Sequence, residues 1–145
     1  MPPSNVAAHP IILRYQNKIS GPLLDRIDMQ IQVAAVPHDQ LLKHADGESS
    51  ATIAARVAQV HAVQLARQGK ENNGLSANEI DQYCKPDSAG EKLLSGAMAH
   101  LHWSARAYHR VLKVARTIAD LGAADTIGAV HVAEAIQYRR ALQNP

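Results

Sequence analysis

The spacing of hydrophobic positions along the chain changes at about residue 38. Before this point, between residues 27 and 34, hydrophobic residues alternate with polar or small ones, as in a strand with one buried face. These hydrophobic residues are Ile27, Met29, Ile31 and Val33. A single strand cannot bury such a face or pair its edges by itself. We therefore expect the other strands of its sheet to lie outside this chain.

Elsewhere the hydrophobic residues follow the three- and four-residue spacing of helices. Residues 11–18 predict a short helix that Ser20-Gly21-Pro22 would end. Five more helices are expected after residue 38, at 49–67, 76–84, between Asp87 and His102, at 104–121 and at 128–140. The residues expected on their buried faces are Ile53, Val57, Val60, Leu93, Leu94, Ala97, Met98, Leu101, Tyr108, Val111, Leu112, Ala115, Ile118, Ala119, Ala129, Val132, Ala133 and Ile136.

Residue types at the expected helix ends support these boundaries. Ser76 and Glu79 have the spacing of a capping box, and Ser104 is a favourable first cap. Gly69 and Gly122 lie just past the ends of two helices, where glycine is preferred. The pattern as a whole predicts a mainly α fold, a compact helical bundle preceded by a fragment that contains a strand.

Composition agrees with a helical core and limits the class of protein. Hydrophobic residues make up 46% of the chain, but only 3% of residues are aromatic, so Leu, Ile, Val and Ala must fill the core. The net charge of +2 does not by itself indicate a nucleic-acid-binding protein. The one cysteine, Cys84, allows no internal disulfide, and we expect it to be buried. The sequence contains no candidate membrane span or secretory signal, so we expect a cytoplasmic protein.

Two arginines are candidate binding residues. Arg26 lies between Asp25 and Asp28 at the entrance of the predicted strand. A local ion pair is the simpler interpretation, whereas a free guanidinium would suit phosphate oxygens. Arg106 lies in the first turn of a predicted helix, where a cation opposes the helix dipole. Arg106 is the first residue of a basic face of this helix, and the simpler interpretation of this face is a solvent-exposed surface. The members of this face are Arg106, Arg110, Lys113 and Thr117.

No catalytic or metal-binding motif is evident in the sequence. His100 and His102 come nearest to a metal-binding pair, but no HExxH motif or cysteine pair accompanies them, so we expect no metal site. Neither a GxSxG motif nor a GxxxxGK[ST] phosphate loop is present. Strand entry and helix caps account for the acidic residues Asp25, Asp28, Glu79 and Glu91.

Two stretches resemble the C-terminal region of magnesium-chelatase-like AAA+ ATPases, the ComM/YifB group. The first is YQNKISGPLLDRID at residues 15–28. The second is SARAYHRVLKVARTIADL at residues 104–121, continued by IGAVHVAEAIQYR at residues 127–139. These motifs are long and nearly without gaps, and the resemblance spans about residues 11–142.

The resemblance implies a fold and a domain organisation. The fold is an AAA+ C-terminal helical lid bundle preceded by the last helix and strand of the α/β ATPase core. Residues 1–10, with three prolines, are then a disordered tail or a cloning remnant. Residues 11–45 are the C-terminal fragment of the AAA+ core, and residues 46–145 are the helical lid domain.

The resemblance also implies roles for the two arginines. Arg26 matches the family's arginine finger, which reaches from one subunit to the nucleotide bound by its neighbour. Arg106 matches the sensor arginine, which touches the nucleotide of its own subunit. ATP, Mg²⁺ and a homo-oligomeric ring, expected to be a hexamer, are implied for the intact protein. The Walker A and Walker B elements are not in this sequence, so we expect this chain alone neither to bind ATP tightly nor to hydrolyse it.

Three functions remain open from the sequence. Resemblance to the ComM group suggests a DNA-remodelling motor that drives branch migration during uptake and recombination of foreign DNA. The chelatase relatives suggest instead the ATPase component of a metal-chelatase or chaperone-like complex. The third is a stand-alone helical adaptor that binds a partner protein. An adaptor should order residues 27–36, whereas a fragment should leave that stretch frayed or aggregating through its edge.

Overall fold

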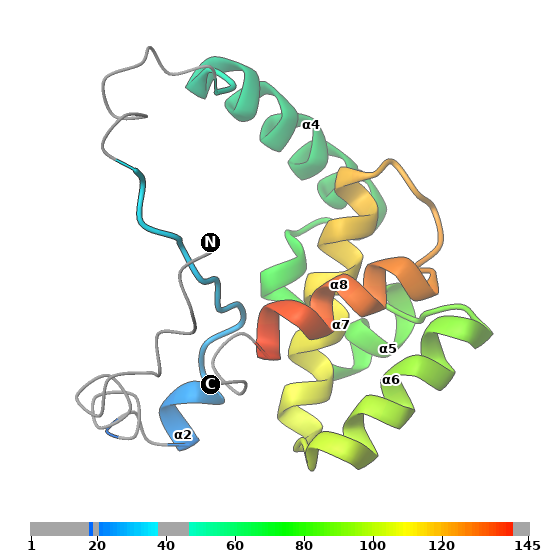
Figure 1. Cartoon of the computed structure of the whole chain (residues 1–145). Helices are drawn as coiled ribbons and strands as arrows, with labels where there is room; N and C mark the ends of the chain where they lie inside the picture. Colours follow the sequence, from blue (N-terminus) through cyan, green and yellow to red (C-terminus); the bar gives the residue numbers. More distant parts are fainter. Residues whose placement is uncertain (1–17, 19–20, 38–46, 141–145) are drawn as a thin grey trace.

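The computed structural model describes residue 18, residues 21–37 and residues 47–140. Within these residues the chain is mainly helical, which confirms the predicted fold class. The elements are α2 (Gly21–Leu24), α4 (Ser50–Gln68), the 3₁₀ turn η1 (Asn72–Gly74), α5 (Ala77–Tyr83), α6 (Ser88–Leu101), α7 (Ala105–Leu121) and α8 (Ala129–Arg140). Helices α5 to α8 form a compact bundle, whereas most of α4 extends away from it (Figure 1). The division into three parts at residues 10 and 45 stays a prediction.

Side-chain caps set the beginnings of most helices. Ser49, Asp87 and Ser104 each accept a hydrogen bond from a backbone N–H in the first turn of α4, α6 and α7. At α5 the Glu79 carboxylate accepts the backbone N–H of Ser76 at 2.8 Å, as the predicted capping box requires. These caps explain why the observed helix boundaries lie close to the predicted ones.

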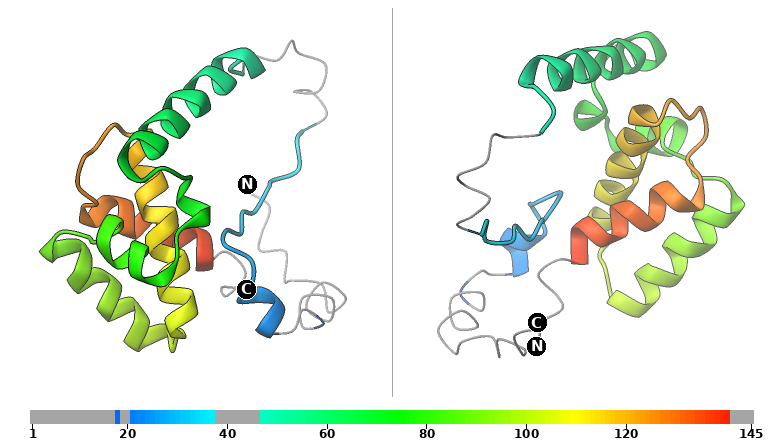
Figure 2. Two further views of the ribbon diagram at one scale, coloured as in Figure 1. Left: turned by 180° about the vertical axis from the view of Figure 1, so that it is seen from behind. Right: turned by 45° about the horizontal axis from the view of Figure 1, so that its top comes forward.

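Helix α7 has the largest number of neighbouring elements in the bundle. It packs against α8, α4, α5 and η1, and α6 packs against α8 (Figures 1 and 2). The buried core residues are Leu75, Ile80, Cys84, Leu94, Val111, Leu112, Ala115, Ala119, Ile127, Val132, Ala135 and Ile136. Cys84 is fully buried, and burial raises the pKa of its thiol to about 11. Its expected role as a small hydrophobic residue therefore holds.

Helix α6 approaches α8 closely at Gly90. A Cβ atom at this position would lie 3.0 Å from Pro86 Cβ and 3.2 Å from Val132 Cγ2. Any larger residue at position 90 would therefore require Pro86 or Val132 to shift by a few tenths of an ångström. The loops before the two helices are also joined, because the N–H of Asp87 donates to the carbonyl oxygen of Ile127 at 2.9 Å.

The strand predicted at residues 27–36 is not formed in the described structure. Residues 27–37 form no regular element (Figure 1). The hydrophobic side chains along them are exposed. Met29 is 47% exposed, Ile31 69% and Val33 80%. A strand needs a neighbour for its backbone hydrogen bonds, and the described residues provide none. The predicted helix at 11–18 lies outside the described residues apart from its last position.

Three side chains expected in the core are exposed instead. They are Ile53 and Val57 on α4 and Leu93 on α6. The buried residues of α4, Val60 and Gln64, both lie in its C-terminal half. Helical periodicity identified the correct face of α4, but it does not reveal how much of that face another helix covers.

A buried polar network joins α4, η1 and α7. The side chain of Asp120 is 1% exposed, and its Oδ1 lies 2.6 Å from Arg67 Nη1 and 2.9 Å from Arg116 Nε. Asn72 Nδ2 donates to Asp120 Oδ2 at 3.0 Å, and the Asn72 backbone N–H donates to Gln64 Oε1 at 3.0 Å. Arg116 also donates to two carbonyl oxygens of the loop after α7. One carboxylate thus ties together three elements and a loop.

The network keeps Asp120 ionised although it is buried. Burial by itself favours the neutral acid, but hydrogen bonds from Arg67 and Asn72 and the charges of Arg116 and Arg67 outweigh it. The pKa of Asp120 is therefore lowered, and its hydrogen bond raises the pKa of Arg67. Asp120 and Arg67 are therefore both charged at neutral pH.

Replacing Asp120 with alanine should lower the free energy of unfolding by about 3–5 kcal/mol, because Arg116 and Arg67 would lose the charge that compensates them. Urea unfolding followed by circular dichroism measures the loss. Glu48→Ala is the matched control, since Glu48 binds Arg56 at 2.8 Å on the exposed surface. This control should leave the urea midpoint of unfolding nearly unchanged, because exposed ion pairs contribute little stability. Equal losses in the two variants would show that burial adds nothing to the Asp120 network.

Acid should weaken the fold through the same carboxylate. Because the folded-state pKa of Asp120 is lowered, its contribution is complete above the unfolded value of about 3.9 and is lost as the pH falls through the folded-state pKa. Glu79 acts in the same direction, since hydrogen bonds from Lys70 and Ser76 lower its pKa to about 2. We expect the free energy of unfolding to fall below about pH 4, and less steeply in Asp120→Asn. Identical pH slopes for the two proteins would contradict this expectation.

Candidate functional site

Arg26 lies between the short helix α2 and the extended residues 27–37. This helix is a single turn of four residues. The backbone N–H of Arg26, just after the helix, donates to the carbonyl oxygen of Leu23 at 3.0 Å. Pro22 favours such a first turn because its φ angle is already helical. This arrangement leaves Arg26 exposed to solvent.

The two carboxylates next to Arg26 are bound by arginines from the lid helices. Asp25 Oδ1 accepts a hydrogen bond from Arg139 Nη2 at 2.9 Å, and Asp28 Oδ1 accepts one from Arg110 Nη1. Among the described residues, the guanidinium of Arg26 has no hydrogen bond or ion pair. The local ion pair that the sequence suggested for Arg26 is therefore not formed.

The backbone around Arg26 is held by the same two arginines, which we call the arginine strap (Arg110 and Arg139). Arg110 Nη1 donates to the carbonyl oxygen of Arg26 at 2.8 Å, and Arg139 Nη1 donates to that of Ile27 at 3.3 Å. The Arg139 side chain is only 5% exposed, and its guanidinium lies 5.7 Å from the ring centroid of Trp103. Residues 25–28 are thus attached to both α7 and α8.

Arg106, the second candidate, lies in the first turn of α7 and is exposed. Its side chain has no hydrogen bond or ion pair within the described part of the chain. Arg110 follows one turn later, so the two side chains leave the helix on the same side. The other members of the predicted basic face are engaged. Lys113 Nζ donates to the carbonyl oxygen of Asn73 at 3.2 Å, and Thr117 donates to the carbonyl oxygen of Lys113 at 2.9 Å.

The strap was not identified from the sequence. Arg139 received no role, and Arg110 was assigned to a solvated face. The only local indication of the strap was that two carboxylates, Asp25 and Asp28, lie close to a single arginine, Arg26, in the sequence. Their partners lie 82 and 114 residues further along the chain, and no local pattern predicts pairs of that separation.

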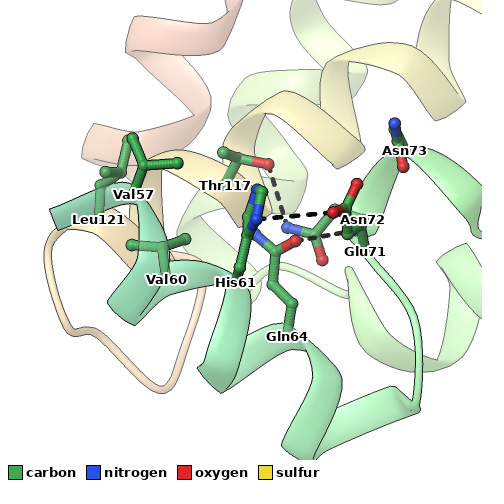
Figure 3. Close-up of a pocket in the computed structure, with 9 residues that line it drawn as sticks. All are labelled: Val57, Val60, His61, Gln64, Glu71, Asn72, Asn73, Thr117 and Leu121. Carbon is green, nitrogen blue, oxygen red and sulfur yellow. Dashed lines mark hydrogen bonds and ion pairs between the residues drawn. The ribbon is translucent and has the colours of Figure 1, made fainter. Parts of the chain in front are cut away.

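A pocket of about 250 Å³ lies between α4, η1 and α7 (Figure 3). Its apolar lining is Val57, Val60 and Leu121, and its polar lining is His61, Gln64, Glu71, Asn72, Asn73 and Thr117. These polar groups bind one another. The backbone N–H of Asn72 donates to Gln64 Oε1, Asn72 Nδ2 donates to Thr117 Oγ1, and His61 Nδ1 lies 3.5 Å from a Glu71 oxygen. These groups join elements of the fold, so the candidate site remains at Arg26 and Arg106.

Arg26 and Arg106 are both exposed, and no contact between the two side chains is seen among the described residues. Exposed guanidinium groups donate planar pairs of N–H bonds, which is the chemistry suited to anions such as phosphate. No group of three or more side chains suited to a metal ion occurs in the described ranges. Within the same ranges, no helix has the length and apolar character needed to cross a membrane.

Comparison with known proteins gives the family. Residues 47–139 match the family described as magnesium chelatase, subunit ChlI C-terminal, and residues 4–41 match magnesium chelatase, subunit ChlI. The protein YifB of Salmonella typhimurium is 45% identical over 128 residues, and the competence protein ComM of Haemophilus influenzae is 44% identical over 129 residues. A protein of Mycobacterium tuberculosis is 32% identical over 131 residues.

Each of these alignments covers 88% of this chain, but the chain spans only 25% or 26% of the length of the relatives. The matched residues include α4 to α8 and both segments that carried the resemblance. The chain therefore belongs to the magnesium chelatase ChlI-like AAA+ family, together with YifB and ComM, and corresponds to its helical C-terminal region.

Proposed function

We propose that this chain is the C-terminal lid and arginine-finger segment of a ring-forming AAA+ ATPase. In this proposal Arg26 reaches the ATP bound by a neighbouring subunit, and Arg106 reaches the ATP of its own subunit. The observation that carries the proposal is the guanidinium of Arg26, which has no partner within the described part of the chain, whereas its neighbouring carboxylates are bound by Arg110 and Arg139. Without those pairs, Asp25 and Asp28 would compete with phosphate for Arg26.

The proposed chemistry needs one positive charge in the right place. Phosphoryl transfer gathers negative charge on the γ-phosphate oxygens, and a guanidinium held against them stabilises the transition state. Arg26 would donate its N–H groups to these oxygens, while Mg²⁺ bound with ATP would neutralise further charge. Because Arg26 acts on the neighbouring subunit, hydrolysis would depend on assembly of the ring, for which we propose a hexamer.

For the substrate of the motor we propose DNA, remodelled by branch migration. The support is similarity to ComM, which is a competence protein by name. The alternative, the ATPase component of a metal-chelatase or chaperone-like complex, is supported by the match to magnesium chelatase. A stand-alone adaptor is disfavoured, because the hydrophobic side chains of residues 27–36 are exposed and unpaired in the described structure.

Arg26→Ala in the full-length ATPase should lower kcat by about 10³-fold or more and leave KM for ATP nearly unchanged, because the charge acts mainly in the transition state. Steady-state hydrolysis of MgATP measures both constants. Arg56→Ala is the control, because it removes an exposed arginine that is paired with Glu48 at the far end of α4. If Arg26→Ala hydrolysed ATP at the normal rate, the assignment of Arg26 as the arginine finger would be wrong.

Mixing the two single variants tests whether the arginines serve different nucleotides. A subunit with Arg26→Ala keeps its own Arg106, and its neighbour with Arg106→Ala still supplies Arg26. Mixed rings should therefore contain some complete sites and hydrolyse ATP faster than either variant alone. If both arginines came from one subunit to the same nucleotide, mixing would restore no activity.

ATPase measurements with and without single-stranded or branched DNA should decide between the proposed substrates. We expect DNA to raise the hydrolysis rate of the full-length protein, since a DNA motor couples turnover to engagement of its track. Double-stranded DNA without branches serves as the comparison. If none of the DNA substrates changed the rate of ATP hydrolysis, the chelatase or chaperone-like function would be favoured.

A further inference from the structure

The contact between α7 and Arg26 involves more than a surface ion pair. One guanidinium group, that of Arg110, contacts both the carboxylate of Asp28 and the backbone carbonyl oxygen of Arg26 itself. The Arg110 side chain is 20% exposed, whereas that of Asp28 is 49% exposed. The exposed ion pair alone contributes little stability. The bond to the carbonyl is different, because it fixes the peptide group from which the Arg26 side chain extends.

The same contact also controls the charge beside Arg26. Asp28 is two residues away from Arg26, and a free carboxylate at that distance would attract the Arg26 guanidinium. Arg110 occupies Asp28 and so removes the nearest local competitor on this side, as Arg139 does for Asp25 on the other. Among the residues that the structure describes, Arg26 is thus unpaired while the strap occupies both neighbouring carboxylates.

We propose that Arg110 is a positioning residue for Arg26: it fixes the Arg26 backbone through the carbonyl oxygen and keeps Asp28 from pairing with the Arg26 guanidinium. Arg110 itself does not touch the nucleotide. This inference rests on the proposed finger function of Arg26, and it assigns to α7 the task of presenting the finger. Arg139 acts on the same segment, but its contact with Trp103 makes its replacement a test of stability as well.

Two variants that remove the same ion pair separate positioning from simple stabilisation. In the full-length ATPase, Arg110→Ala removes both the ion pair and the carbonyl bond and leaves Asp28 free, whereas Asp28→Asn removes the ion pair alone. We expect Arg110→Ala to lower kcat by about 10- to 100-fold with KM for ATP little changed, since a small misplacement of a catalytic group has effects of this size. Asp28→Asn should change kcat by less than about twofold.

The double variant Arg110→Ala/Asp28→Asn tests the role of the free carboxylate. It should recover part of the kcat lost in Arg110→Ala, because Asp28 can no longer pair with Arg26 as a charged group. Thermal unfolding is the folding control, and Arg110→Ala should melt close to Asp28→Asn. If Arg110→Ala does not fold, Arg110→Lys replaces it. Arg110 contacts both partners through the single nitrogen Nη1, and a lysine side chain is one bond shorter. We expect the lysine to keep the pair with Asp28 without reaching the carbonyl oxygen as well, so kcat should still fall.

The outcomes for Arg26 and Arg110 are distinguishable. If Arg26→Ala abolishes hydrolysis while Arg110→Ala and Arg110→Lys retain the normal kcat, the positioning role is wrong and the finger assignment stands. Equal losses of kcat in Arg110→Ala and Asp28→Asn would also overturn it, since the ion pair alone would then explain the effect. Normal hydrolysis in Arg26→Ala would remove the proposed function and this inference with it.

Discussion

The buried carboxylate of Asp120 is the interaction on which the arrangement of the helices depends. A charge with a side-chain exposure of 1% is tolerated only because Arg67, Arg116 and Asn72 surround it with hydrogen bonds. These partners come from α4, η1 and α7, so satisfying one charge fixes the positions of three elements. Helix α4 contributes little to the hydrophobic core. The polar network therefore provides much of the contact that attaches this helix to the bundle.

Arginines on α7 and α8 also bind carboxylates of another segment, but these carboxylates are partly exposed to solvent. The strap pairs of Arg110 with Asp28 and of Arg139 with Asp25 involve carboxylates about half exposed, so their value lies less in stability than in geometry. Each arginine adds a bond to a backbone carbonyl, which an ion pair between flexible side chains alone would not provide. Helix α7 thus carries both the exposed Arg106 and the residue that holds the segment of Arg26.

Predictions from the sequence succeeded where the signal was local. Caps at Ser76 and Ser104 mark helix starts through hydrogen bonds within one turn, and they were identified correctly. Predictions failed where burial depends on a distant neighbour. Ile53 and Val57 have the right periodicity, but the described residues cover them only in part, and the alternation at 27–36 lacks a paired strand there. Arg26 was selected as a candidate from its sequence context, but its freedom from Asp25 and Asp28 depends on residues far along the chain.

By itself the sequence determined that the chain is helical, where most helices begin and end, and which family it resembles, because periodicity, caps and contiguous motifs act over a few residues. Tertiary structure decided which polar groups meet. The pairing of Asp120 with Arg67, and of Asp28 with Arg110, joins residues 53 and 82 positions apart. Such contacts form only when packing of the apolar faces brings separate elements together, and a linear pattern contains no information on the distance between them. Whether an arginine is bound or free is therefore a property of the fold.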